Sequence, residues 1–492
     1  MPRISFKIRE VVVMNYAIIR YILGVVLKFE ALFLCLPAAV GFIYQEKTFF
    51  SFLISILLCL AVGVALSWKK PENSVFYASE GFAAVSLSWI VLSIFGALPF
   101  CISREIPSFT DALFETISGF TTTGASILND VEALSHCTLF WRSFTHWIGG
   151  MGVLVFILAV FPMSGGYHMY LMKAESPGPS VEKLVPKVKN TAMILYGIYT
   201  AMTLLEIILL FITGMPLFDS LTLSFGTAGT GGFGIRNDSI GGYAPHLQVI
   251  ITVFMILFGV NFNVYYLMLC KKFRQVFHSQ EVLTYLGIIL ASGLIIAFNI
   301  RHIFPNPPEA LRHAFFQVGS IITTTGYGTT DFNVWPQISK TLLVMLMFIG
   351  ACAGSTGGGI KVSRIIIMLK SVIKELFTIV HPRAVRKIKM DGRSVEHDTL
   401  RAVNVFVVAY AFIFFFSLLA IAWDNFDFTT NFTAVAATLN NIGPGLEKVG
   451  PTANFASFSP FSKYVLMFDM LTGRLEIFPM LILLSPVTWK RR

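Results

Sequence analysis

Apolar runs of about 20 residues recur along the whole chain, and such a run is long enough to cross a ~30 Å hydrocarbon core as a helix. Charged residues gather between these runs. Residues 16–44 and 49–68 predict a leading helical hairpin. Four further pairs of runs follow it: 83–103 with 139–161, 192–215 with 247–270, 282–300 with 337–369, and 402–423 with 461–487. The predicted fold is an all-α polytopic membrane protein with ten spans.

Between the helices of each pair lies a segment of roughly a dozen residues, too short to span, that ends in a glycine-containing loop. Aligned on Gly124, Gly232, Gly326 and Gly443, the loops are spaced 108, 94 and 117 residues apart. Ordinary extracellular linkers do not explain why this arrangement recurs. The pattern therefore predicts four fused helix–pore-loop–helix repeats around one pore, built from a single polypeptide.

The segment before each loop predicts a short helix that enters the membrane. Asp111 and Asp219 both stand thirteen residues before their glycine, where they suit a helix N-terminus. Thr430 holds the same offset and is a candidate cap, whereas His313 holds it in a weaker pattern. Such helices would aim their negative C-terminal ends at the centre of the pore, which favours a cation.

The loops predict a filter of backbone carbonyls. The third loop, Thr324-Thr325-Gly326-Tyr327-Gly328, is similar to the TVGYG loop of tetrameric potassium channels, whose carbonyls replace the ion's hydration shell. Turning carbonyls inward requires backbone conformations that glycine adopts without a Cβ penalty. The predicted K⁺ ligands are the carbonyls of Thr122, Thr123, Gly124, Thr230, Gly231, Gly232, Thr324, Thr325, Gly326, Asn441, Ile442 and Gly443.

A glycine-rich stretch, residues 350–359, interrupts the apolar segment after the third loop and should break its helix. Ile360 separates Gly359 from Lys361, so the GxxxxGK pattern of a phosphate-binding loop is absent. Two interpretations stay open: a loop below the filter that obstructs the pore, or tight helix packing by small residues. In the first, the predicted gate residues are Gly350, Gly354, Gly357, Gly358, Gly359 and Arg474.

Two arginines fall inside predicted spans, where a charge is costly. Arg474 is either a pore residue, acting as a barrier or as a partner for the carbonyls of residues 350–359, or one half of an ion pair with an acid on another helix. Glu476 would point to a different helix face. Arg142 and His146 share one helix face, and a structural role is the better interpretation for both.

The composition excludes a soluble protein, because only 13% of residues are charged, against about 25% in a soluble domain. The net charge of +10 follows the positive-inside rule and not nucleic-acid binding: basic residues, Lys361 and Arg364 among them, concentrate on one predicted side. An enzyme is disfavoured because the nine histidines show no metal spacing such as HExxH. A purely structural membrane subunit is the remaining alternative. Cys101 and Cys137 fall on the predicted outer side, where a disulfide is possible.

Together, several motifs resemble the Trk/Ktr/HKT superfamily of potassium transporters. They are the four loop glycines, the glycine-rich break, Gly473-Arg474-Leu475-Glu476 and Trp147-Ile148-Gly149-Gly150-Met151-Gly152. The leading hairpin favours the bacterial TrkH type. Gly124 stands where sodium-permeable plant relatives can carry Ser, which favours potassium selectivity. The fourth loop, ending in Gly443-Pro444, departs most from TTGYG.

The resemblance implies a protein of the bacterial inner membrane that takes up K⁺, needs no organic cofactor, and has both termini in the cytosol. It implies a homodimer with a cytosolic nucleotide-binding regulatory subunit of the TrkA type, and it makes residues 350–359 the gate with Arg474 beside it. Ion-coupled symport of the Ktr type remains the alternative to gated diffusion. The predicted units are residues 1–70 (tail and hairpin), 71–175, 176–275, 276–390 and 391–492 (pore repeats).

Overall fold

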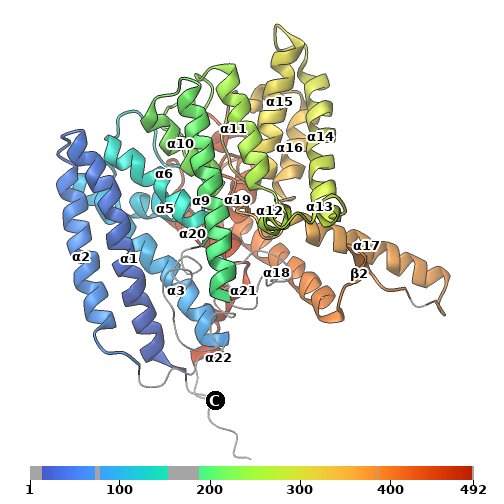
Figure 1. The fold of residues 1–492 in the computed structure, drawn as a ribbon, viewed down its shortest axis with the longest axis horizontal. Helices are drawn as coiled ribbons and strands as arrows, with labels where there is room; N and C mark the ends of the chain where they lie inside the picture. The colour runs from blue at the N-terminus through green and yellow to red at the C-terminus, as the bar shows by residue number, and fades with distance from the viewer. Residues whose placement is uncertain (1–13, 72–77, 153–187, 385, 490–492) are drawn as a thin grey trace, which may run out of the picture.

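The computed structural model describes residues 14–71, 78–152, 188–384 and 386–489. Within them, regular structure is helical apart from one small antiparallel hairpin of β1 (Lys389–Met390) and β2 (Arg393–Ser394). Helices α1 (Tyr16–Ile43) and α2 (Phe49–Ser67) form the predicted leading hairpin at one edge of the molecule (Figure 1). Gly24 and Gly63 let these two helices approach closely, since a Cβ on Gly24 would lie 2.7 Å from the Gly63 carbonyl oxygen.

The turn of this hairpin is attached to the helix that follows the first loop. Both oxygens of Glu46 accept hydrogen bonds at the start of α6 (His136–Gly150), from the N–H of His136 at 2.7 Å and of Cys137 at 3.1 Å. Burial opposes ionisation of Glu46, but these hydrogen bonds outweigh it and lower the pKa of the carboxyl. The described cysteines are all free thiols, so the possible Cys101–Cys137 disulfide is not formed.

After the hairpin, the order of outer helix, short helix, loop and inner helix occurs four times. The outer helices are α3 (Ala78–Gly96, followed by α4, Leu98–Ser103), α9 (Val188–Ile212), α14 (Gln280–Ile300) and α18 (His397–Ile421). The short helices are α5 (Phe109–Phe120), α10 (Leu217–Gly229), α15 (Pro307–Ile322) and α19 (Phe428–Leu439). The inner helices begin as α6, α11 (Pro245–Phe258), α16 (Gln337–Met347) and α20 (Pro460–Arg474).

The sequence predicts ten spans, and in the described residues three of the four inner segments are broken helices. The described residues contain six helices long and apolar enough to cross a membrane, or seven if a bent pair counts as one span. That pair is α11 and α12 (Phe262–Leu269), bent by 90° within the predicted helix 247–270. The segment 337–369 splits into α16 and α17 (Val362–Val380), and α20 stops at Arg474 before α21 (Phe478–Leu484). The end of the predicted helix 139–161 lies outside the described residues.

The breaks coincide with glycines or with positive φ angles in the backbone. Glycines separate α16 from α17 as the sequence predicts, and Gly259 ends α11. In the last inner segment, Glu476 and Ile477 both adopt positive φ angles, of 59° and 69°. A β-branched residue in that region is strained, so this break could not be anticipated from composition.

The short helices begin close to where the sequence places them. Asp111, Asp219 and Thr430 each stand in the first turn, three residues after the cap, so Thr430 is not itself the cap. Asp427 caps α19 by accepting from the N–H of Thr430 at 2.9 Å and from its hydroxyl, and these bonds lower the pKa of Asp427. His313 lies inside α15, which starts at Pro307, so its predicted terminal position is wrong.

The outer surface carries many exposed large apolar side chains, which lipid would cover. They are dense on α2, α9, α14 and α18. On the far side from the leading hairpin, α17 extends away from the body and past the β1–β2 hairpin (Figure 1), which accepts a hydrogen bond from Lys370 in the first half of α17. The boundary between the first two predicted repeats, at residue 175, lies outside the described residues, and the other unit boundaries stay predictions.

Candidate functional site

The four glycine loops share one backbone conformation. In each loop the glycine has a positive φ: 77° at Gly124, 77° at Gly232, 86° at Gly326 and 97° at Gly443. The residue two positions earlier also has a left-handed φ, which is unusual for a side chain other than glycine. These residues are Thr122, Thr230, Thr324 and Asn441, with φ between 55° and 60°. The loops therefore match residue by residue, as the alignment on glycine predicts.

The same hydrogen bonds hold all four loops to their short helices. The N–H of the residue before each glycine donates to the carbonyl five residues earlier, at 2.8 Å in every case. The pairs are Thr123 with Ser118, Gly231 with Gly226, Thr325 with Ser320, and Ile442 with Ala437. Because these N–H groups already bond to carbonyls of the short helices, they do not engage the carbonyls of the loop residues.

The loops contact one another in cyclic order. A Cβ added to Gly124 would overlap the carbonyl oxygen of Gly231 in the second loop, and one added to Gly232 would overlap that of Thr325 in the third. Gly326 lies in the same way against the carbonyl of Ile442. Gly443 closes the circle, since its Cβ would lie 2.7 Å from the Thr123 oxygen of the first loop. Four chemically equivalent carbonyls thus form a closed ring.

Packing behind the ring explains why one loop has glycine at a position where the others carry side chains. A Cβ on Gly231 would overlap the imidazole of His146, which fills the space behind the second loop. The ring Nδ1 donates to the Gly119 carbonyl at 2.8 Å, and Nε2 accepts from the N–H of Phe233 at 3.2 Å. His146 therefore connects the short helix α5 of the first repeat to the second loop, which is a structural role as predicted.

The divergent fourth loop is held by its asparagine. The Asn441 amide donates to the Thr123 hydroxyl of the first loop and to the Met470 carbonyl of α20, both at 2.9 Å. The third loop is held differently: Tyr327 is buried, and its hydroxyl donates to the Leu223 carbonyl of α10 at 3.0 Å. Different side-chain contacts therefore hold loops that share the same backbone conformation.

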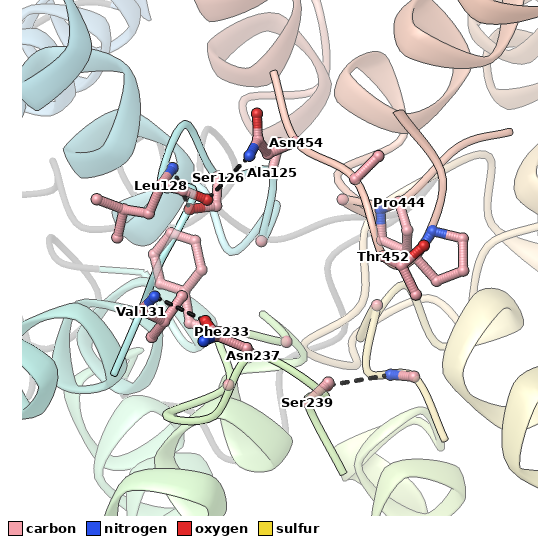
Figure 2. Close-up of a pocket in the computed structure, with 18 of the residues that line it drawn as sticks. Ala125, Ser126, Leu128, Val131, Phe233, Asn237, Ser239, Pro444, Thr452 and Asn454 are labelled. Atoms are coloured by element: carbon pink, nitrogen blue, oxygen red, sulfur yellow. Dashed lines mark hydrogen bonds between the residues drawn. The ribbon is translucent and has the colours of Figure 1, made fainter. Parts of the chain in front are cut away.

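A cavity of about 200 Å³ opens on one face of the ring (Figure 2). All four loop glycines line it, together with residues that follow them, such as Ser126, Phe233 and Pro444. The loops around it are tied together by hydrogen bonds, for example from the N–H of Val131 to the Asn237 side chain at 2.8 Å. An ion approaching from this side would reach the loop glycines first.

The glycine-rich loop lies on the opposite face of the ring. The N–H of Gly358 donates to the Thr324 hydroxyl at 2.7 Å, and a Cβ on Gly358 would lie 2.5 Å from the Asn440 carbonyl oxygen. A Cβ on Gly357 would lie 2.9 Å from the Thr323 carbonyl oxygen. The loop thus contacts residues that precede the filter glycines, whereas the cavity is lined by residues that follow them. It is a loop beneath the ring, and α16 and α17 do not join as a continuous packed helix.

Two cations, the buried Lys361 and the half-buried Arg474, hold this loop. Arg474 donates to the Thr356 carbonyl at 2.8 Å and to the carbonyls of Gly149 and Gly150 at 2.5 and 2.6 Å. It therefore partners a carbonyl of residues 350–359, the first of the two roles considered for it. The Lys361 ammonium donates to the carbonyls of Gly357 and Gly358. Lys361 is buried, so the residue that the sequence counted among the basic residues of the cytosolic side contacts protein carbonyls and not solvent.

Other charged residues around the loop were missed by sequence reasoning. Glu281 of α14 accepts from the N–H of Ala353 at 2.7 Å and of Ser363 at 3.1 Å, so one carboxylate joins both ends of the loop. Arg364, also counted as cytosolic, is buried and pairs with Glu476. Glu281 could have been identified from the sequence, because an acidic residue at the start of an apolar span is uncommon.

Comparison with known proteins identifies the family. Residues 48–490 match the TrkH family model, described as a cation transport protein. The chain belongs to the TrkH family. It is 38% identical to the Trk system potassium uptake protein TrkH of Salmonella typhimurium and 37% identical to that of Escherichia coli, covering 97% of this chain and all of each relative. The crystal structure of the potassium transporter TrkH from Vibrio parahaemolyticus superimposes with a TM-score of 0.86 at 34% identity, over 97% of this chain and 100% of the other.

This membership confirms the resemblance drawn from the motifs and the helical membrane fold. A family of cation transport proteins is not a family of enzymes, which agrees with the rejection of a catalytic role. The leading hairpin, the broken inner helices and the four loops are therefore features of a TrkH-family chain.

Proposed function

We propose that this chain takes up potassium across the bacterial inner membrane through the ring of loop carbonyls. The observation that carries the proposal is the cyclic contact of each loop glycine with the carbonyl before the next one. Potassium is weakly hydrated, and carbonyl oxygens held in rings can replace its water shell. The relatives are named as potassium uptake proteins of the Trk system, which supports K⁺ as the transported ion.

The helices around the ring favour a cation there. Helices α5, α10, α15 and α19 each end at a loop, and a helix C-terminus carries partial negative charge. The twelve predicted ligands, from Thr122 to Gly443, are the carbonyls of the three positions up to and including each glycine. Entry is from the cavity in Figure 2, which leads directly to these glycines.

Residues 350–359 form the gate. The loop contacts the ring on the face opposite the cavity, and its closed position is held by Arg474, Lys361 and Glu281. Among the predicted gate residues, Gly354 and Gly359 have positive φ angles of 68° and 66°, and Gly350 packs against Gly358 where a Cβ would overlap. Such a backbone can move without dragging large side chains through the pore.

Both termini lie in the cytosol. The rings of Tyr16 and Trp489 stack with their centroids 6.2 Å apart, so the ends of the described chain share one face. The basic residues of 370–401 give that assignment its direction under the positive-inside rule. We propose further that the chain works as a homodimer with a cytosolic regulatory subunit of the TrkA type, as the resemblance of its motifs implies.

Flux into liposomes containing the purified chain, with and without a fixed membrane potential, tests the function. Potassium uptake that follows the potential supports gated diffusion. Uptake that requires a sodium or proton gradient would replace it with symport, although the relatives are Trk-system proteins and so do not favour the Ktr type. A complete lack of cation flux would favour the remaining alternative, a purely structural membrane subunit.

Neutralising Arg383, Arg386 and Lys387 together is expected to weaken binding of the regulatory subunit at low salt. All three side chains are exposed just after α17, beyond the end of the helix that projects from the body (Figure 1). Screening acts over about 10 Å at 0.1 M salt, so removing these charges should also flatten the salt dependence. A charge-conserving triple (Arg383→Lys, Arg386→Lys, Lys387→Arg) is the control. Undiminished binding by the neutral triple would remove this surface from the docking site.

Replacing Glu281 with Ala is expected to raise basal potassium flux several-fold without changing the K⁺/Na⁺ flux ratio. The variant removes the oxygen that accepts from Ala353 and Ser363, and loss of a hydrogen bond to a charged group costs about 1.5–3 kcal/mol. Glu281→Gln keeps one carbonyl oxygen there and should have the smaller effect. Equal flux in the wild type and both folded variants would show that Glu281 does not hold the loop.

A further inference from the structure

A buried ion pair lies at the wall of the cavity, between the first and second loops, and Arg142 lines that cavity. Glu115 lies in α5 and Arg142 in α6, and their side chains are 1% and 2% exposed. The Glu115 Oε1 atom lies 2.6 Å from Nη2 of Arg142 and 2.8 Å from its Nε, a two-point contact. The guanidinium of Arg142 is buried inside a membrane protein, where an unpaired charge is costly.

The pair holds the backbone of the first loop just after its glycine. The Glu115 carboxylate accepts from the Ser126 hydroxyl at 3.0 Å and from the N–H of Ile127 at 3.0 Å. Arg142 adds a contact to the same hydroxyl at 3.4 Å. These residues follow Gly124 by two and three positions, so their placement sets where the Gly124 peptide stands.

Arg142 also reaches the second loop. Its Nη1 donates to the Gly234 carbonyl at 3.2 Å, and its guanidinium lies 4.1 Å from the centroid of the Phe233 ring. Both residues follow Gly232 directly. One guanidinium thus connects the segments after two neighbouring loop glycines, and these are the loops in which Gly124 packs against the Gly231 carbonyl.

The other three loops have no charged residue at the position of Glu115. Nine residues before the glycines stand Glu115, Leu223, Gln317 and Ala434. A charge-assisted contact between buried side chains is stronger and more rigid than a neutral one. The pair is therefore a local brace between the first and second loops, and not an element repeated around the ring.

We propose that the Glu115–Arg142 pair is a specificity-determining brace that fixes the spacing of the first and second filter loops. The inference rests on the proposed function of the ring as a potassium filter. The pair acts in two ways. The fork of Arg142 sets geometry by bonding Glu115 and the second loop at once, and Glu115 neutralises a cation that would otherwise repel ions in the ring.

The geometric role of Arg142 and the neutralising role of Glu115 predict different outcomes for two variants. Arg142→Lys keeps the charge but loses the planar fork, which a lysine cannot replace at a two-point site. It should lower the K⁺/Na⁺ flux ratio by about threefold or more while potassium flux is largely kept. Glu115→Gln leaves the guanidinium uncompensated, so it should lower the flux of both ions as well as the ratio.

The matched control is Glu46→Gln, the same chemical change in a carboxylate that bonds the start of the same helix α6, away from the ring. It should leave the flux ratio unchanged. Each variant is compared in liposomes after its amount and assembly in membranes are matched. A role in folding alone predicts lower amounts of protein with an unchanged ratio.

Ser126→Ala decides the question if the charged variants do not assemble, because it removes only the hydroxyl between the pair and the first loop. A reduced ratio supports the brace. Unchanged ratios in Ser126→Ala and in any assembled pair variant would overturn it. The ring itself is tested separately: if loop-glycine variants alter the ratio and the brace variants do not, only the brace is wrong.

Discussion

Replacing Gly326 with Ser is expected to lower the K⁺/Na⁺ flux ratio by roughly tenfold, since a side chain in this conformation costs about 1–3 kcal/mol and each ~1.4 kcal/mol is tenfold. The glycine has a φ of 86°, and its Cβ would overlap the Ile442 carbonyl oxygen of the next loop. That oxygen belongs to backbone and can move only if the ring opens. Gly124→Ser should act likewise against the Gly231 carbonyl. Flux of both ions into liposomes at a fixed potential measures the ratio.

Two other glycines separate the causes of that effect. Gly214 also has a positive φ, of 101°, but a Cβ there would meet nothing within 4 Å. Gly214→Ser carries backbone strain without a clash at the ring, so its ratio should equal that of the wild type. Gly443 is intermediate between Gly326 and Gly214, because its Cβ would lie 2.7 Å from the Thr123 carbonyl oxygen. If Gly326→Ser and Gly124→Ser both kept the wild-type ratio, the ring would not be the filter.

The loops could be located from sequence because glycine is the residue that their backbone requires. Gly124, Gly232, Gly326 and Gly443 all have positive φ angles, and an alignment on glycine alone finds them. Their cyclic order could not be found in this way, since contacts between residues that are far apart in the sequence, such as Gly443 and Thr123, leave no local pattern. The absence of a side chain at Gly231 likewise depends on His146, which comes from another repeat.

Charge was the least reliable guide. The positive-inside rule describes loops that face water, and it was applied to Lys361 and Arg364 because they follow an apolar segment. The broken helix instead returns these residues into the protein, where carbonyls and Glu476 bind them. The break after Arg474 was missed for a related reason. It depends on strained φ angles at Glu476 and Ile477 that tertiary contacts impose and propensity does not reveal.

Deleting residues 350–359 is expected to raise basal potassium flux on the order of tenfold, equivalent to ~1.4 kcal/mol of closing free energy, and to leave the K⁺/Na⁺ ratio unchanged. The deletion is tolerable because the loop leaves and returns at nearly one point. Ile349 and Ile360 pair as a β-bridge, and the N–H of Gly350 donates to the Ile360 carbonyl at 2.7 Å. The ring carbonyls lie outside the deleted residues, so selectivity should persist.

Arg474→Ala should raise flux in the same direction but less, because the loop keeps its contacts with Lys361 and Glu281. In the double variant the two effects should be less than additive, since Arg474 acts on the loop that the deletion removes. Arg474→Lys is the control for charge, as a lysine keeps the cation but cannot bond Thr356, Gly149 and Gly150 together. If residues 350–359 only packed helices, the deletion would lower the amount of protein and abolish flux. A deletion variant that assembles normally and shows ordinary or reduced potassium flux would contradict the gate, because removing an obstruction from the pore must raise flux.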